Sequence, residues 1–213
     1  MTSHHPESLT LMEFSAGNLS DPHALCIRLH LDQCPHCRSR VDMLESLGAV
    51  MMEQQDQVSV SESAFDSILA RIESEPRQEN RTHSAQRPMG PLQKLLGDDL
   101  NSLPWKRQLG DVSILDISDR FPDQSEQVVL QKLTAGGKAP AHTHRGQETT
   151  IVLQGAFADN KGVFHQWDFV VLNEKDEHKP VALEGDDCIT LSVLSAPLKL
   201  TGMFTRMLNP FIR

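Results

Sequence analysis

The chain has 213 residues, enough for one large domain or two ordinary ones, and a formal charge of -9. This charge argues against a general nucleic-acid binder, whose surface is usually basic, and no apolar run approaches the roughly 18 residues that a membrane-spanning helix needs. The first 85 residues hold 6 basic and 13 acidic side chains, which indicates either a solvated acidic domain or a basic partner.

The first 75 residues place apolar side chains at the 3.6-residue period of helices, and we expect about four helices there. Proline favours the first position of a helix, whereas glycine favours its end, and both residues punctuate this part of the chain. The expected helices begin at Pro6, at Ser20 or Asp21, at Pro35 and near Glu62, with stops at Gly17 and near Gln54 and Ser74.

The fourth expected helix carries an apolar stripe whose members are three or four residues apart and therefore share one face. Such a stripe is most simply part of a core. A partner-binding face is the alternative, because a short amphipathic helix at a domain edge can dock in a groove. The stripe consists of Phe65, Ile68, Leu69 and Ile72.

Residues 75–91 are polar, contain three prolines and show no periodicity, as linkers do. Beyond them the apolar period changes to 2, with glycines between the runs, which predicts the short strands of a sandwich or barrel. We therefore expect a multidomain α plus all-β chain, with a helical bundle over residues 1–80, a linker over 81–94 and a β domain over 95–213. The clearest strand-like runs are 112–117, 127–130, 149–153, 168–172 and 189–194.

His30, Cys34 and Cys37 form the pattern H-x3-C-x2-C at the junction of the second and third expected helices. Two thiols and an imidazole at this spacing supply three of the four ligands of a tetrahedral zinc site. A cysteine at a helix N-terminus also feels the positive end of the helix dipole, which favours the thiolate that zinc requires. An incidental or redox-active cysteine pair is the alternative.

A fourth ligand is needed to close this zinc site. We favour His5, because it directly precedes a helix that must pack on the junction, and its neighbour His4 competes with it. His36 lies between the two thiols and is expected to point away. Cys26 shares a helix face with His30 but is more often a small buried apolar residue.

The arrangement resembles the zinc-binding anti-sigma domain, in which a small helical bundle carries H-x3-C-x2-C and a further histidine near the N-terminus. The resemblance covers roughly residues 1–80. It implies that His5, His30, Cys34 and Cys37 hold zinc, and that the bundle wraps an extracytoplasmic-function (ECF) sigma factor. The acidic charge of this part suits a partner with basic surfaces.

A second cluster of ligand types lies in the β domain. His142 and His144 are two residues apart, so on a strand both side chains point to the same side of a sheet. Glu148 follows at the start of the next expected strand, and His178 supplies a fourth ligand from a later one. Imidazole and carboxylate suit zinc but also Fe, Mn or Ni.

The spacing from Gly136 through His142, His144 and Glu148 to Gly155 resembles the first cupin motif throughout. The resemblance implies a jelly-roll-like cupin β-barrel with its metal held by these residues and His178. The second cupin motif is degenerate here: Trp167-Asp168 stands where Gly-Asp is usual, and Asn173 stands where proline is common. The departure bears on the shape of the loop more than on the ligand.

A zinc-binding anti-sigma domain followed by one cupin is similar to the ChrR family, over nearly the whole chain. That resemblance implies zinc in both domains, inhibition of the sigma factor by the helical domain, and release on oxidative stress such as singlet oxygen through the cupin. It implies a regulator with no catalytic turnover and no direct contact with nucleic acid or membrane. Cys188 lies on an expected barrel strand and is more simply a buried inert thiol, with a redox sensor as the alternative.

A metal-dependent cupin enzyme of the dioxygenase type, with the helical domain as an accessory, is the alternative function. The four cysteines do not resemble a disulfide framework, and no signal peptide precedes them. We therefore expect a cytoplasmic protein.

Overall fold

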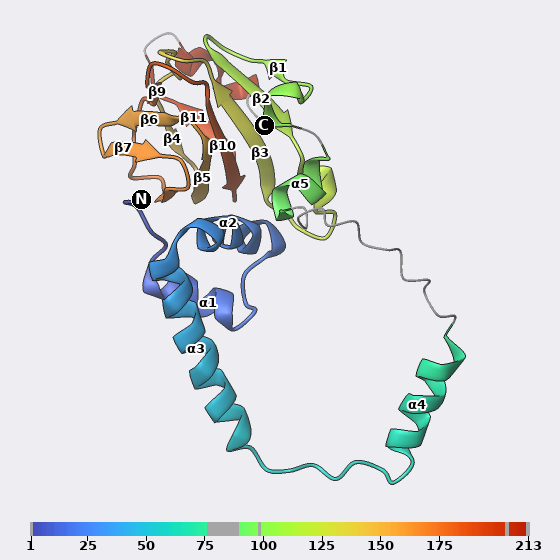
Figure 1. Cartoon of the computed structure of the whole chain (residues 1–213). Helices are drawn as coiled ribbons and strands as arrows, with labels where there is room; N and C mark the ends of the chain where they lie inside the picture. The colour runs from blue at the N-terminus through green and yellow to red at the C-terminus, as the bar shows by residue number, and fades with distance from the viewer. Residues whose placement is uncertain (1, 76–89, 98, 203–204, 212–213) are drawn as a thin grey trace.

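A computed structural model describes residues 2–75, 90–97, 99–202 and 205–211. Helices form the first part of the chain and β-strands the second, as the sequence predicts (Figure 1). No helix within the described ranges combines the length and the apolar character needed to cross a bilayer.

Three helices pack together next to the β domain: α1 (Ser8–Ser15), α2 (Asp21–Gln33) and α3 (Pro35–Glu53). Helix α1 begins two residues later than expected, after an extended Glu7. Proline occupies the first turn of both α2 and α3, where its missing N–H group is not needed. The side chains of Leu11, Ile27, Leu31 and Val41 are buried among these helices.

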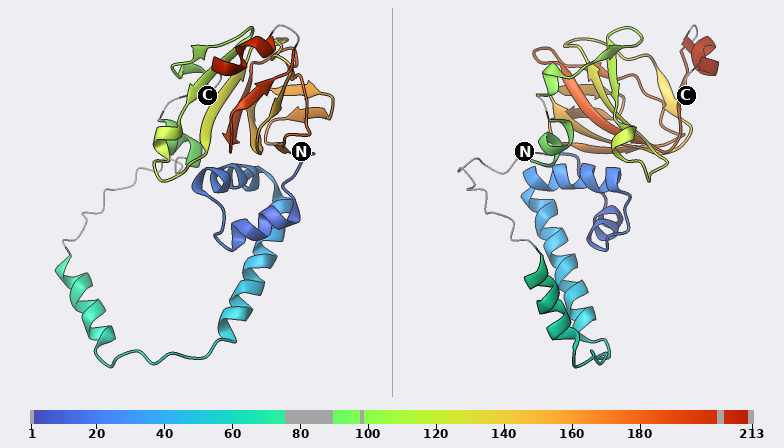
Figure 2. Two further views of the ribbon diagram at one scale, coloured as in Figure 1. Left: turned by 180° about the vertical axis from the view of Figure 1, so that it is seen from behind. Right: turned by 90° about the vertical axis from the view of Figure 1, so that its right-hand side faces the viewer.

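Helix α4 (Ala64–Ser74) stands away from the rest of the molecule in Figure 1 and in the left view of Figure 2. The expectation that its apolar stripe forms core is wrong: Phe65 is 69% exposed and Ile72 is 65% exposed. The outer half of α3 is similar, since Leu47 and Met51 are also exposed. Amphipathic spacing fixes which side chains share a face, but it does not say which surface covers that face.

The β domain contains one six-stranded antiparallel sheet and two smaller ones. Together they close into the barrel-like sandwich seen in Figure 1. The large sheet has the order β1 (Lys106–Arg107), β2 (Val112–Asp116), β3 (Gln127–Leu133), β10 (Cys188–Leu194), β5 (Glu148–Gln154) and β8 (Phe169–Leu172). One small sheet pairs β11 (Leu198–Leu200) with β4 (His142–His144), and the other has the order β7 (Gly162–His165), β6 (Ala156–Asp159) and β9 (Val181–Ala182).

All five expected strand runs are strands, within one to three residues at their ends. Helix α5 (Pro91–Leu96) overlaps the end of the expected linker, whereas residues 76–89 lie outside the described part. The described residues also form three short 3-10 helices: η1 (Leu100–Ser102), η2 (Ser118–Arg120) and η3 (Thr205–Phe211).

Helix α2 lies across one end of the barrel, where it contacts β5 and β10 (Figure 1). The apolar core continues through this junction, because Leu29 of α2 belongs to the same buried cluster as Ile151 and Phe169 of the barrel. The helices and the barrel therefore share a core where α2 and the sheet meet.

Candidate metal centres

The H-x3-C-x2-C residues meet where α2 ends and α3 begins. Cys34 is both the C-cap of α2 and the N-cap of α3. Its Sγ accepts a hydrogen bond from the Cys37 amide at 3.5 Å. His30 lies one turn upstream in α2, and all three side chains are buried. The two helices thus aim the three groups at one point.

His5 completes a four-residue group, here called the helical cluster: His5, His30, Cys34 and Cys37. One ligand atom from each lies within 4.8 Å of all the others. His5 Nδ1 is 3.3 Å from His30 Nε2, 3.4 Å from Cys34 Sγ and 3.5 Å from Cys37 Sγ.

These separations fit a tetrahedral ion. Zinc bound at about 2.05 Å to nitrogen and 2.3 Å to sulfur sets two nitrogen ligands about 3.3 Å apart and a nitrogen and a sulfur ligand about 3.6 Å apart. His30 Nδ1 lies 2.8 Å from the backbone oxygen of Trp167, so this nitrogen carries the proton and donates it. The Nε2 lone pair of His30 is then free to face the cluster, as a ligand requires.

The neighbouring histidines and cysteine lie elsewhere. The His4 ring turns to Asp168, with Nδ1 at 3.1 Å from Oδ2, and His36 is exposed on the outer side of the cluster. Cys26 is fully buried, and burial raises the pKa of its thiol to about 12. Burial also acts to raise the pKa of Cys34, but hydrogen bonds from Thr2 and from the Cys37 amide outweigh it and lower that pKa.

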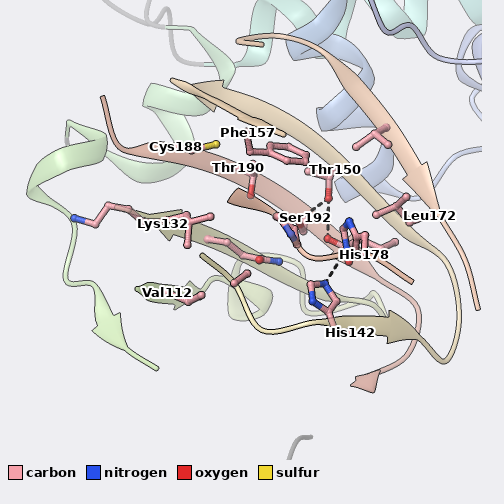
Figure 3. Close-up of a pocket in the computed structure, with 16 residues that line it drawn as sticks. Val112, Lys132, His142, Thr150, Phe157, Leu172, His178, Cys188, Thr190 and Ser192 are labelled. Atoms are coloured by element: carbon pink, nitrogen blue, oxygen red, sulfur yellow. Dashed lines mark hydrogen bonds between the residues drawn. The ribbon is translucent and has the colours of Figure 1, made fainter. Parts of the chain in front are cut away.

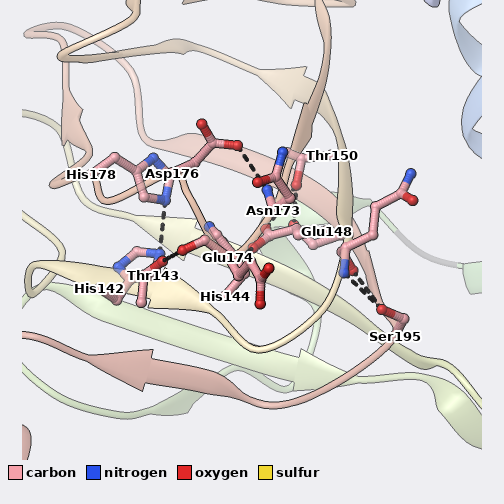
Figure 4. Close-up of polar contacts among 12 residues, drawn as sticks. His142, Thr143, His144, Glu148, Thr150, Asn173, Glu174, Asp176, His178 and Ser195 are labelled. Carbon is pink, nitrogen blue, oxygen red and sulfur yellow. Dashed lines mark hydrogen bonds and ion pairs between the residues drawn. The ribbon is translucent and has the colours of Figure 1, made fainter.

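The second group lies inside the barrel and is here called the barrel cluster: His142, His144, Glu148 and His178 (Figure 4). Strand β4 carries the first two histidines on one side, as the i, i+2 spacing predicts, and β5 begins at Glu148. His178 pairs with His142 through a backbone bridge. Ligand nitrogens of the three histidines lie within 4.8 Å of one another.

The hydrogen bonds of His142 and His178 leave two lone pairs facing each other. His142 Nδ1 donates to the Pro140 oxygen at 2.8 Å, and His178 Nδ1 donates to Asp159 Oδ2 at 2.8 Å. Both Nε2 atoms are then acceptors, yet they lie only 2.9 Å apart. A cation between them satisfies both, so the donor set fits a metal ion.

Buried atoms of His144 and Glu148 that lack hydrogen bonds also indicate a metal site. Both ring nitrogens of His144 and Oε2 of Glu148 are buried without a well-aligned hydrogen bond, although His144 Nδ1 lies 3.0 Å from Oε2. Buried polar atoms rarely stay unpaired. Glu148 lies outside the tight group of three nitrogens, and its other oxygen accepts from the Thr150 hydroxyl at 2.8 Å.

Burial of Glu148 acts to raise its pKa, but the contacts with His144, His142 and Thr150 outweigh burial and lower the pKa to about 2. Burial and the neighbouring His178 lower the pKa of His142 to about 4. The cluster therefore holds an ionised carboxylate beside an uncharged imidazole at neutral pH, the protonation states that metal ligands need.

Asp159 is part of this site although the sequence does not single it out, and its side chain is buried against His178. A carboxylate behind a ligating histidine fixes the ring and increases its basicity. Asp159 sits at the tight turn between β6 and β7, where aspartate is common for local reasons, so the sequence carries no signal of this role.

The cavity beside the barrel cluster is small, about 60 Å³, and is lined by His142, Glu148, His178 and Cys188 among others (Figure 3). Cys188 is buried at the start of β10, and burial raises the pKa of its thiol to about 12. A larger apolar cavity of about 330 Å³ also includes His142 in its lining, together with Leu109, Ile114 and Leu198 among others.

Comparison with known proteins gives matches over both parts of the chain. Residues 96–197 match the family described as the ChrR cupin-like domain. The chain is 32% identical over 212 residues to the anti-sigma-E factor ChrR of Cereibacter sphaeroides, covering 99% of this chain and 98% of that protein. It is also similar to a chain in the crystal structure of Rhodobacter sphaeroides SigE in complex with the anti-sigma ChrR, with a TM-score of 0.76, 31% identity, and coverage of 92% of this chain and 100% of the other.

Proposed function

This chain belongs to the ChrR family of anti-sigma factors, and we propose that it is a zinc-dependent anti-sigma factor. It binds and inhibits an ECF-type sigma factor and releases it under oxidative stress such as singlet oxygen. The observation that carries the proposal is the similarity in sequence and fold, over nearly the full chain, to a protein crystallised with its sigma factor.

The exposed apolar faces of α3 and α4 support a protein partner. Leu47, Met51, Phe65 and Ile72 are each more than half exposed, although apolar side chains of this size are usually buried. A short amphipathic helix such as α4 gains most of its stability when its apolar face packs against another surface. We infer that the sigma factor covers these faces, with the acidic charge of the first 85 residues facing its basic surface.

In this proposal the helical cluster holds zinc through His5, His30, Cys34 and Cys37. The ion supplies a fixed tetrahedral junction and no chemistry of turnover. The ligands lie at the contact of α2, α3 and the N-terminal segment, so the bound ion sets the angle at which α3 leaves the bundle. The metal thereby holds the partner-binding face in one orientation.

The barrel cluster holds the second ion in this proposal, through His142, His144, Glu148 and His178. Zinc is the ion that the family resemblance implies, and the same ligands also suit Fe, Mn or Ni. These metals differ in redox chemistry, so the identity of the ion decides how an oxidant acts at this cluster.

The alternative of a cupin enzyme has less support. Ligand pockets commonly measure about 300–1,000 Å³, whereas the cavity at the barrel cluster measures about 60 Å³ and holds no more than a few water molecules. The 330 Å³ cavity touches the cluster only through His142. Oxygen uptake by the iron-loaded protein with small diketones or thiols would favour the enzyme.

The direct test is co-purification of the tagged chain with an ECF sigma factor from the same cells. The proposal expects a stable 1:1 complex that keeps the sigma factor from core RNA polymerase, and less complex after exposure to singlet oxygen. A sigma factor that binds core polymerase equally well with and without the chain would overturn the proposal.

A further inference from the structure

The N-terminal segment that carries His5 is bound to the barrel through Asp168. The Asp168 side chain is fully buried. Its Oδ1 accepts the Ser3 amide at 2.7 Å and the His4 amide at 3.1 Å. Its Oδ2 lies 3.1 Å from the Ser3 hydroxyl and 3.1 Å from His4 Nδ1. One carboxylate thus holds the two residues that directly precede His5.

The next barrel residue adds to this attachment, because the Phe169 amide donates to the His4 carbonyl at 3.1 Å. The side chain of Asp168 also accepts the His165 amide at 2.9 Å, which fixes the carboxylate within its own turn. The path of residues 3–5 is therefore set by the barrel and not by α1.

Trp167 holds the second histidine of the helical cluster. Its carbonyl accepts the Nδ1–H of His30 at 2.8 Å, and its own amide donates to the Val152 carbonyl at 2.7 Å. Trp167 has a φ of 73°, in the left-handed region that disfavours residues with a side chain. A bulky residue stays in such a conformation only where its surroundings impose it, and here they direct the carbonyl at His30.

We propose that Trp167 and Asp168 are positioning residues for the helical cluster, through which the barrel orients two of the four ligands, His30 and His5. This inference rests on the proposed binding of metal by that cluster. Trp167 fixes the ring of His30, and Asp168 fixes the segment that delivers His5. The barrel thus orients the two histidines, whereas the helix junction alone positions the two cysteines.

The attachment also lies on a strand pair that reaches the barrel cluster. Asp168 directly precedes β8, and β8 pairs with β5 from Phe169↔Ile151 to Leu172↔Glu148. Glu148 belongs to the barrel cluster. A shift of the paired strands β5 and β8 would therefore also move Trp167 and Asp168, which precede β8 and contact His30 and the segment of His5. Weaker contacts from these two residues would weaken metal binding by the helical cluster.

Cobalt makes the inference measurable in the full chain, because only the helical cluster has thiolates and only it gives thiolate-to-cobalt charge-transfer absorption. The absorption is followed after a chelator is added in excess. Asp168→Asn and Ser3→Pro are expected to lose the absorption about tenfold faster than wild type, the low end of the effect of removing an outer partner of a metal ligand. Ser3→Pro removes the amide donor without altering the barrel, so it remains informative where Asp168→Asn fails to fold.

Two matched controls separate positioning from general damage. Ser3→Ala loses the hydroxyl but keeps the amide, and it is expected to stay within about threefold of wild type. Asp116→Asn alters a carboxylate that also caps a turn, through the Ser118 amide at 2.9 Å, but belongs to the β2 side of the barrel. It is expected to release cobalt at the wild-type rate.

The outcomes distinguish this inference from the proposed function. Absence of the charge-transfer absorption in wild type would overturn the metal site itself. A normal absorption in wild type, with Asp168→Asn and Ser3→Pro releasing cobalt no faster than wild type or no faster than Asp116→Asn, would overturn the positioning role alone.

Discussion

Truncation of Phe65 on α4 is expected to weaken sigma-factor binding without destabilising the free chain. Phe65 is 69% exposed, and full burial of such a side chain stabilises by about 1.5–3 kcal/mol. If the partner covers the exposed two-thirds, Phe65→Ala costs about 1–2 kcal/mol of binding, or roughly 5- to 30-fold in Kd. Adding Ile72→Ala, at a position 65% exposed, should raise the loss to roughly 30-fold or more.

The assay is a titration of the labelled sigma factor with wild type and variants, beside thermal unfolding of each free chain. Unfolding of Phe65→Ala should match wild type within about 0.5 kcal/mol, because the described part of the chain leaves this side chain 69% exposed. Leu11→Ala, at a position 1% exposed, should instead cost about 2–5 kcal/mol of stability. Met207→Ala, at an exposed apolar position on the barrel side, should leave Kd unchanged. A Kd within twofold of wild type for the Phe65 and Ile72 double variant would show that the sigma factor does not cover the apolar face of α4.

Three further results are expected. Replacing Cys34 and Cys37 together by serine should remove one equivalent of metal from the full chain, as counted by elemental analysis. It should also lower the unfolding temperature of the bundle, because metal binding and folding are linked. A variant that keeps two equivalents of metal would contradict the ligand assignment. Asp159→Asn should lower the metal affinity of the barrel cluster about 10- to 100-fold and leave the thiolate-to-cobalt absorption intact. An unchanged metal affinity would show that Asp159 does not position His178 as a ligand. Iodoacetamide at pH 8 should not label Cys26 or Cys188 in the native protein. Burial raises the pKa of each thiol to about 12, and the thiolate is the reactive form. Rapid labelling detected by mass spectrometry would show that their burial is not maintained.

The sequence predicts most of the helical cluster because its spacing is local. His30, Cys34 and Cys37 lie within eight residues, and Pro35 marks the helix start that brings the two sides together. The choice between His4 and His5 is different in kind. It depends on how the N-terminal segment crosses the barrel, and that path is set by Asp168, more than 160 residues away.

The limits elsewhere have similar physical causes. The five expected runs correspond to β2, β3, β5, β8 and β10, but the pattern does not reveal the four-residue strands β6 and β7. Strands β1 and β9 are two residues long and too short to alternate. The stripe of α4 is visible in the sequence, whereas its exposure depends on the absence of a covering surface in the described chain. The left-handed backbone of Trp167 is not predictable either, because tryptophan has no preference for that conformation.

In the function proposed for this protein, a metal ion held by the helical cluster gives the bundle the shape that captures a sigma factor. The most direct measurement compares the affinity of the metal-loaded chain for the ECF sigma factor with that of the variant in which Cys34 and Cys37 are both serine. We expect a loss of about 100-fold or more, since removing the ion releases the junction from which α3 projects. Equal affinity in the two proteins, with the metal shown to be missing from the variant, would contradict it.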